Sequence, residues 1–265
     1  MSKEMLINFS TVLALAPITI FSLYQKREFN WTFWFLLCVS VIGPVTALLI
    51  KLSGSWLTDL GTSIWATIAM TMFLFALSAL LLNEIWKLAP LVSGYMILLG
   101  ITASLVSTDN VNTLREISSP WISLHIIFSI TTYGLLTISA ISAFGAAVQE
   151  HSLKAKILNP IYRLLPSITD CDNLMVRLLV ISEIILGIGL LSGMAIGYLN
   201  YQTLFPLNHK SLLTLAAFIV IAILLITHFQ IGIRGRRAAR YVLTAYLLLT
   251  LAYLGVKFVT DIIIN

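Results

Sequence analysis

Histidines are the side chains of this sequence best suited to bind a metal or move a proton, and two of them fall at one predicted membrane depth. His125 lies about one turn inside an apolar segment that starts near Trp121, and His209 directly precedes another. Ionisable or metal-binding side chains inside a membrane are costly, so each is a candidate functional residue. A neutral imidazole is a common axial ligand of haem iron, and two can share one iron. His125 and His209 are therefore candidate iron ligands, with a hydrogen bond at the interface as the alternative.

His228 belongs to a different depth. It lies nineteen residues after His209, which is about 28 Å along a helix, so it cannot share an iron with the outer pair. Its depth resembles that of Glu183 in the preceding apolar segment. A pair formed by His228 and Glu183 is a candidate second ligand site or proton relay, and a buried structural hydrogen bond explains it equally well. His151 lies in a polar connection and is predicted to be solvated.

The elements that must position these residues are membrane helices. The 265 residues are 59% hydrophobic and 10% charged, with a mean hydropathy of +0.98, which is far from the balance of a soluble domain. Continuous apolar stretches of about 20 residues favour helices over a β-barrel. We predict an all-α polytopic membrane helical bundle, a single integral membrane domain over 1–265, with eight transmembrane helices near 6–24, 31–51, 60–82, 88–106, 121–146, 174–198, 211–231 and 239–260.

The lysines and arginines predict the orientation. Five fall on one side of the predicted bundle and eleven on the other, and the richer side is expected to be cytoplasmic. Both termini are then outside, and the histidine pair faces the periplasm of a bacterial inner membrane. The eleven are Lys26, Arg27, Lys87, Lys154, Lys156, Arg163, Arg177, Arg234, Arg236, Arg237 and Arg240.

Several local patterns have a structural and a functional interpretation. Gly189, Gly193 and Gly197 follow one another at four-residue spacing, which permits close helix packing or the approach of a flat ligand. The basic stretch 233–240 indicates inside anchoring, with an anionic-lipid or acidic-ligand site as the alternative. Cys38 is predicted inside a span and Cys171 in a cytoplasmic loop, so no disulfide or redox dithiol is expected.

Common soluble catalytic motifs are absent from the sequence. It contains no dinucleotide-binding glycine loop, Walker sequence, GxSxG or HExxH. Nothing supports nucleic-acid binding, and the partner that the composition predicts is the lipid bilayer.

Three stretches resemble the membrane proteins of cytochrome c assembly, the CcsA/CcmC/CcmF superfamily, in its short HemX or YpjD type. They are WISLHIIFSITTYGLLTISAISAF, DNLMVRLLVISEIILGIGLLSGM, and the segment from HKSLLTLAAF through GIRGRRAAR to LAYLGVKF. The resemblance covers about 118–262. It implies haem as a cofactor, His125 at the position of an external haem-ligating histidine, and His228 at that of a histidine within the membrane.

The sequence also departs from the larger relatives, in which a tryptophan-rich WWD segment holds the porphyrin edge. The connection 200–210 contains no tryptophan, so haem attachment to an apocytochrome is not expected and no enzyme activity is predicted. His209 is a geometric candidate to replace the missing external ligand. The leading interpretation is a protein that binds or handles haem at the periplasmic face, with other cytochrome c assembly or haem-pathway membrane proteins as partners.

Two other interpretations stay open. One is a membrane scaffold or regulator that keeps the fold without haem. The other is a small-solute transporter, in which Pro44, the glycines of the sixth span and the pair of Glu183 and His228 form a pathway near the bilayer midplane.

Overall fold

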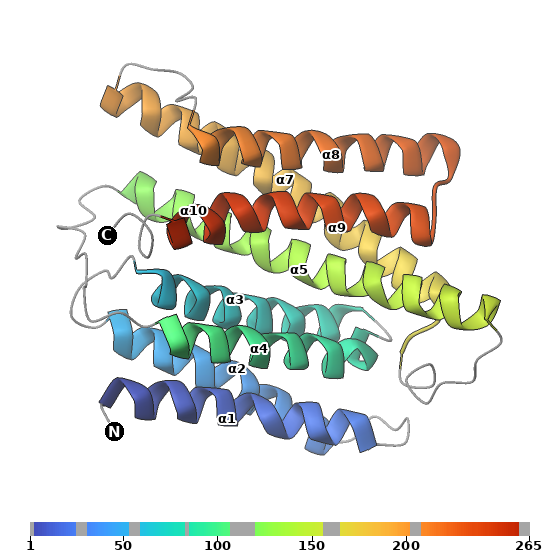
Figure 1. Ribbon diagram of the computed structural model, residues 1–265, viewed down its shortest axis with the longest axis horizontal. Coiled ribbons are helices and arrows are strands. Elements are labelled where there is room, and N and C mark those ends of the chain that lie inside the picture. Colours follow the sequence, from blue (N-terminus) through green and yellow to red (C-terminus); the bar gives the residue numbers. More distant parts are fainter. Residues whose placement is uncertain are drawn as a thin grey trace. The chain divides into compact units, whose positions relative to one another are not determined.

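The computed structural model describes residues 3–24, 31–52, 59–82, 85–106, 120–155, 165–201 and 208–259, and all regular elements in these ranges are helical (Figure 1). Eight helices of the described ranges are long and apolar enough to cross a membrane. The elements are α1 (Lys3–Tyr24), α2 (Trp31–Leu52), α3 (Leu60–Leu81), η1 (Ile85–Leu88), α4 (Ala89–Val106), α5 (Pro120–Lys154), α7 (Ile168–Tyr201), α8 (His209–Ile231), α9 (Arg236–Thr250), η2 (Leu251–Gly255) and α10 (Val256–Phe258). The prediction of eight apolar helices is confirmed.

The helices group into two compact units, Met1–Glu116 and Ile117–Asn265. The first holds α1 to α4, in which α1 packs on α2 and α4, and α3 packs on α2 and α4. Small residues allow this packing, since a methyl group on Gly100 would lie 3.0 Å from Val12 and 3.3 Å from the ring of Trp65. The prediction of one membrane domain, and that of both termini outside, remain predictions.

The second unit holds α5, α7, α8, α9, η2 and α10. The long helices α5 and α7 pack along each other, α9 packs on α5, and α8 packs on α7 and α9. A tyrosine cluster joins α5 to α9: the Tyr133 hydroxyl lies 3.1 Å from that of Tyr246 and 3.1 Å from Oγ1 of Thr250. Tyr133 is 1% exposed, so polar groups are paired here inside an apolar helix bundle.

The last helix changes its winding after Thr250. Segment η2 is a π-helical turn, in which the backbone N–H of Val256 donates to the carbonyl of Leu251, five residues back. The N–H of Leu251 still donates to Leu247, four residues back. One additional residue is therefore accommodated in a single turn.

Helices α5 and α7 are longer than the sequence predicted. The spans expected to end at 146 and to begin at 174 continue to Lys154 and start at Ile168. Polar side chains make these extensions favourable, because the Gln149 amide donates to the carbonyl of Pro166 and the Ser167 hydroxyl accepts the N–H of Asp170. Cys171, expected in a loop, is instead buried in the first turn of α7.

Two carboxylates hold the turn between α8 and α9. Asp172 accepts the N–H of Gly235 at 3.3 Å through each of its oxygens, and Glu150 accepts the N–H of Arg236 at 2.8 Å. Carboxylates are favourable at a helix N-terminus, here that of α9. Gly235 has φ 60° and ψ −134°, a conformation that side chains rarely adopt, and a methyl group there would lie 2.6 Å from Oε2 of Glu150.

Candidate functional site

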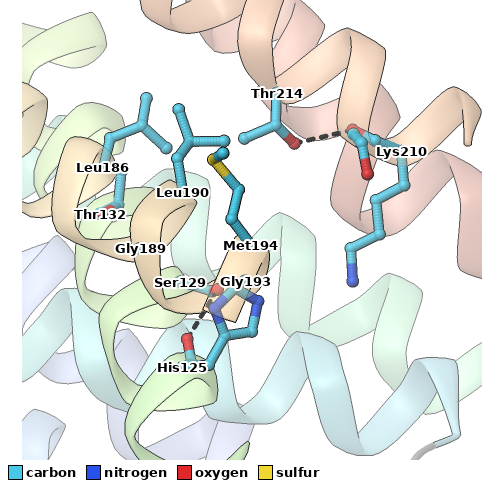
Figure 2. Close-up of a pocket in the computed structure, with 11 residues that line it drawn as sticks. His125, Ser129, Thr132, Leu186, Gly189, Leu190, Gly193, Met194, Lys210 and Thr214 are labelled. Atoms are coloured by element: carbon cyan, nitrogen blue, oxygen red, sulfur yellow. Dashed lines mark hydrogen bonds between the residues drawn. The ribbon is translucent and has the colours of Figure 1, made fainter. Parts of the chain in front are cut away.

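A cavity of about 230 Å³ lies between α5, α7 and α8. Figure 2 shows its lining, which comes from the first turns of α5 and α8 and from the second half of α7. The spacing from His125 to Thr132 on α5 is seven residues, so the cavity extends about 10 Å along the helices. It is lined by His125, Ser129, Thr132, Leu186, Gly189, Leu190, Gly193, Met194, Lys210, Ser211 and Thr214.

The orientation of His125 is fixed by a hydrogen bond across two helices. Nδ1 of this half-buried imidazole lies 2.9 Å from Oγ of Ser192, and the Ser192 hydroxyl donates to the carbonyl of Gly189 at 2.8 Å. Since the serine hydrogen is used on the carbonyl, its oxygen accepts a hydrogen from Nδ1. A neutral ring then carries no hydrogen on Nε2, which is the form of histidine that ligates metals.

Gly193 provides the space that the imidazole occupies. A methyl group at this position would lie 3.1 Å from Cε1 of His125, closer than side chains normally approach. At Gly189, one turn earlier, a methyl group would be 3.8 Å from Cβ of Phe128, an ordinary contact. Of the three predicted glycines, Gly193 leaves room for the imidazole and Gly189 accepts the Ser192 hydrogen through its carbonyl, whereas Gly197 is outside the cavity lining.

A buried hydroxyl without a partner in the described residues lies at the inner end of the cavity, and Glu183, which is outside the lining, is close in sequence to the lining residues of α7. Thr132 is 1% exposed, and its Oγ1 makes no hydrogen bond within the described residues. Glu183 lies on α7 one turn before Leu186 and on the same face, as expected for a spacing of three. Both of its carboxyl oxygens are buried without a hydrogen-bond partner in the described part of the chain.

The structure does not bring all of the predicted residues into one site. His209 and Lys210 are both exposed in the first turn of α8, but only Lys210 lines the cavity. Trp121 is 61% exposed in the first turn of α5 and is also outside the lining. The role of His209 as a second ligand stays a prediction.

His228 lies at the other end of α8. Its Nδ1 donates to the carbonyl of Ile233 at 2.8 Å, just after the helix ends at Gly232. The hydrogen bond considered as one explanation of the pair of His228 and Glu183 is not formed, since neither Glu183 oxygen has a hydrogen-bond partner among the described residues. The imidazole instead satisfies a carbonyl of the α8–α9 turn.

Comparison with known proteins places this arrangement in a family. The model of a family described as cytochrome C assembly protein matches residues 28–264. The chain belongs to the cytochrome c assembly protein family. Every residue that lines the cavity falls within the matched range.

Two relatives extend this result. The chain is 40% identical over 272 residues, and 100% of both chains, to a protein of Azospirillum brasilense described as an uncharacterized 28.8 kDa protein in the nifR3-like 5' region. It is 27% identical over 183 residues to the inner membrane protein YpjD of Escherichia coli, covering 68% of this chain and 67% of the relative. No solved structure matches. This member of the cytochrome c assembly family is a multi-pass membrane protein.

Sequence reasoning missed Ser192, Met194 and Lys210, three residues that build the site in this family member. Each lies within one turn of a predicted residue, but none is unusual at the surface or interface of a membrane helix. A spacing of three or four residues places polar or small side chains on one face of a helix, as for His125, Ser129 and Thr132. A search of each apolar segment for such a face is the signal that could have found these residues.

Proposed function

We propose that this protein binds haem in the cavity beside His125, at the periplasmic end of its helices, and passes it to other cytochrome c assembly or haem-pathway membrane proteins. The observation that carries the proposal is the half-buried imidazole whose Nδ1 is held by Ser192. This bond leaves Nε2 available as an axial ligand, and membership of the cytochrome c assembly family supports the choice of haem.

The residues present fit such a ligand. Gly193 leaves the space that a side chain would fill next to the imidazole, and the leucines at 186 and 190 offer apolar contact to a macrocycle. The lining of the cavity also includes the Met194 thioether, which is an axial ligand of haem in other proteins. When bound, haem would supply an iron that accepts the imidazole nitrogen of His125.

The size of the cavity favours transient holding. Sites that enclose most of a drug-sized ligand measure about 300–1,000 Å³, and this cavity measures about 230 Å³. It can therefore hold one edge of a porphyrin and leave the remainder accessible. A partner could then reach the exposed part, which suits a protein that hands its ligand on.

The proposal is tested by oxidised and reduced absorption spectra of the detergent-purified protein after addition of haem. The parent is expected to show a stoichiometric Soret band that is lost in His125→Ala. His151→Ala is the matched control, because His151 is exposed at the far end of the same helix. His209→Ala and His228→Ala report whether either supplies a second ligand.

The same spectra can refute the proposal. A parent that remains colourless with excess haem would refute haem binding and leave a scaffold or regulator as the function. A band that persists in His125→Ala with unchanged intensity and position would move the site elsewhere. Gel filtration of each variant shows whether the fold is intact.

A further inference from the structure

One end of the cavity is lined by an exposed, positively charged side chain that forms no ion pair with a carboxylate of the described residues. Lys210 lines it from α8, and its lining includes no aspartate or glutamate. The ion pair found in the described ranges joins Lys154 to Glu150, at the other end of the unit. Figure 2 shows the Lys210 side chain extending from the helix toward the level of the His125 ring.

The backbone adds to this positive potential. Asn208, at the N-cap of α8, makes no side-chain cap hydrogen bond, so the first N–H groups of the helix are not satisfied by that side chain. The N-terminus of a helix favours anions through these groups and through its dipole. Ser211, in the same turn, also lines the cavity.

The ionisable side chains lie at one end of the lining. Its outer end holds His125, Lys210 and Ser211, and its inner end is formed by Leu186 together with Thr132. Thr132 is 1% exposed and its Oγ1 has no partner in the described part of the chain, so the cavity is built to receive a further group at its inner end as well. A ligand that matches this lining has its acid group toward the outer end, where Lys210 lies.

We infer that Lys210 and the first turn of α8 bind a carboxylate of the ligand while His125 takes its metal. The inference rests on the proposed function and specifies its substrate class: a metalloporphyrin whose acid side chains are free, as in haem, and not esterified. Lys210 is then a specificity-determining residue. It distinguishes a porphyrin acid from a neutral porphyrin of the same size.

The test compares haem with its dimethyl ester in Lys210→Met, which keeps the length of the side chain and removes the charge. Charge-assisted hydrogen bonds contribute about 1.5–3 kcal/mol, which corresponds to roughly tenfold to a hundredfold in Kd. The parent should bind haem more tightly than the ester by this factor. Lys210→Met should bind both equally, at the level of the ester, and Lys210→Arg should restore the preference.

The control variant is Lys257→Met. Lys257 lies near the end of the last helix, with its ammonium 6.0 Å from the Tyr253 ring, and it is outside the cavity lining. Its substitution should leave the preference for the acid unchanged. Equal losses for haem and ester in Lys210→Met would indicate a structural role for the lysine and overturn the inference, as would no loss in either.

Metal-free protoporphyrin and its dimethyl ester separate this inference from haem ligation, since neither needs an iron ligand. A Lys210-dependent preference for the free acid, with no Soret shift caused by His125, would support the anchor and refute ligation. His125-dependent ligation without any acid preference would refute the anchor alone, and failure of all four porphyrins to bind would refute both. Displacement of the acid by phosphatidylglycerol would assign the anion site to a lipid phosphate and overturn the inference.

Discussion

The imidazole of His125 on α5 and the hydroxyl of Ser192 on α7 form an interhelical hydrogen bond, with 2.9 Å between Nδ1 and Oγ. The serine in turn donates to the carbonyl of Gly189. A group that orients a ligating histidine is worth about 10–100-fold in metal affinity. The packing of α5 against α7 therefore decides whether the hydrogen bond that orients the His125 ring can form.

Ser192→Ala should weaken haem binding by roughly tenfold to a hundredfold without unfolding the protein, because the ring loses the acceptor that fixes its hydrogen on Nδ1. Haem titration followed at the Soret band measures the effect. Ser182→Ala is the control: its hydroxyl also donates to a carbonyl three residues back, that of Leu179, and Ser182 does not line the cavity. Equal effects of the two variants would contradict the role of Ser192.

Gly193→Ala should displace the imidazole, because the new methyl group would lie 3.1 Å from Cε1 of His125. We expect a weaker or spectrally altered haem complex. Gly187→Ala, whose methyl group would lie 3.5 Å from Phe218 and outside the cavity lining, should bind haem normally and gain about 0.5–1 kcal/mol of stability from the loss of a helical glycine. Identical spectra in both variants would show that the ring does not depend on Gly193.

Gly235→Ala should destabilise the second unit by about 1–3 kcal/mol, the usual cost of a strained backbone conformation. The new methyl group would also displace the Glu150 carboxylate, which lies 2.6 Å from its position. A thermal midpoint in detergent measures the loss. Gly232→Asn is the matched control, since Gly232 has φ 74° with nothing within 4 Å and asparagine accepts that conformation. A midpoint for Gly235→Ala as high as that of Gly232→Asn would refute the prediction.

Tyr133→Phe should lower the stability of the second unit by about 1 kcal/mol, because two hydrogen bonds are lost and each is worth roughly 0.6 kcal/mol between membrane helices. The ring itself keeps its packing against Tyr246 and Tyr253, with centroids 5.5 Å and 5.9 Å away. Tyr198→Phe, at a side chain that is 50% exposed, should leave the thermal midpoint unchanged. A larger effect at Tyr198 than at Tyr133 would contradict the assignment.

Glu183→Leu should stabilise the fold, because it removes carboxyl oxygens that are buried without a partner in the described residues. The thermal midpoint is expected to rise by roughly 2–4 °C for each kcal/mol gained. Ile184→Leu, at a 60% exposed position, should leave it unchanged. A fall in the midpoint of Glu183→Leu would show that the carboxyl group has a stabilising partner. A costly group of this kind inside a membrane helix is a candidate for function, so haem binding by Glu183→Leu should be measured as well.

Depth along the helices could be predicted from the sequence, because it depends only on where apolar stretches begin and end. Helix α2 was expected over 31–51 and is Trp31–Leu52, and His125 lies about one turn inside α5 as expected. The ends of α5 and α7 were predicted too short. The end of α5 and the start of α7 are stabilised by the side-chain hydrogen bonds of Gln149 and Ser167, which hydropathy does not report.

The face that each helix presents to its neighbours could not be predicted in the same way. His209 and Lys210 have almost the same depth, but about 100° of helical rotation separates them, and only Lys210 lines the cavity. Polar residues at either position are compatible with a helix start at the membrane surface. The lateral arrangement depends on packing between α5, α7 and α8, where apolar residues occur on all sides of each helix.

The π-helical turn at Leu251–Gly255 has the effect of a single-residue insertion in an otherwise regular helix. One additional residue rotates everything that follows by about 100°. The side chains of Val256, Lys257 and Phe258 therefore point about 100° away from the directions they would have in an uninterrupted α-helix. Tyr246 and Thr250 precede the turn and keep their hydrogen bonds with Tyr133. The turn therefore sets the direction of the last residues of this helix without moving the residues that bind Tyr133.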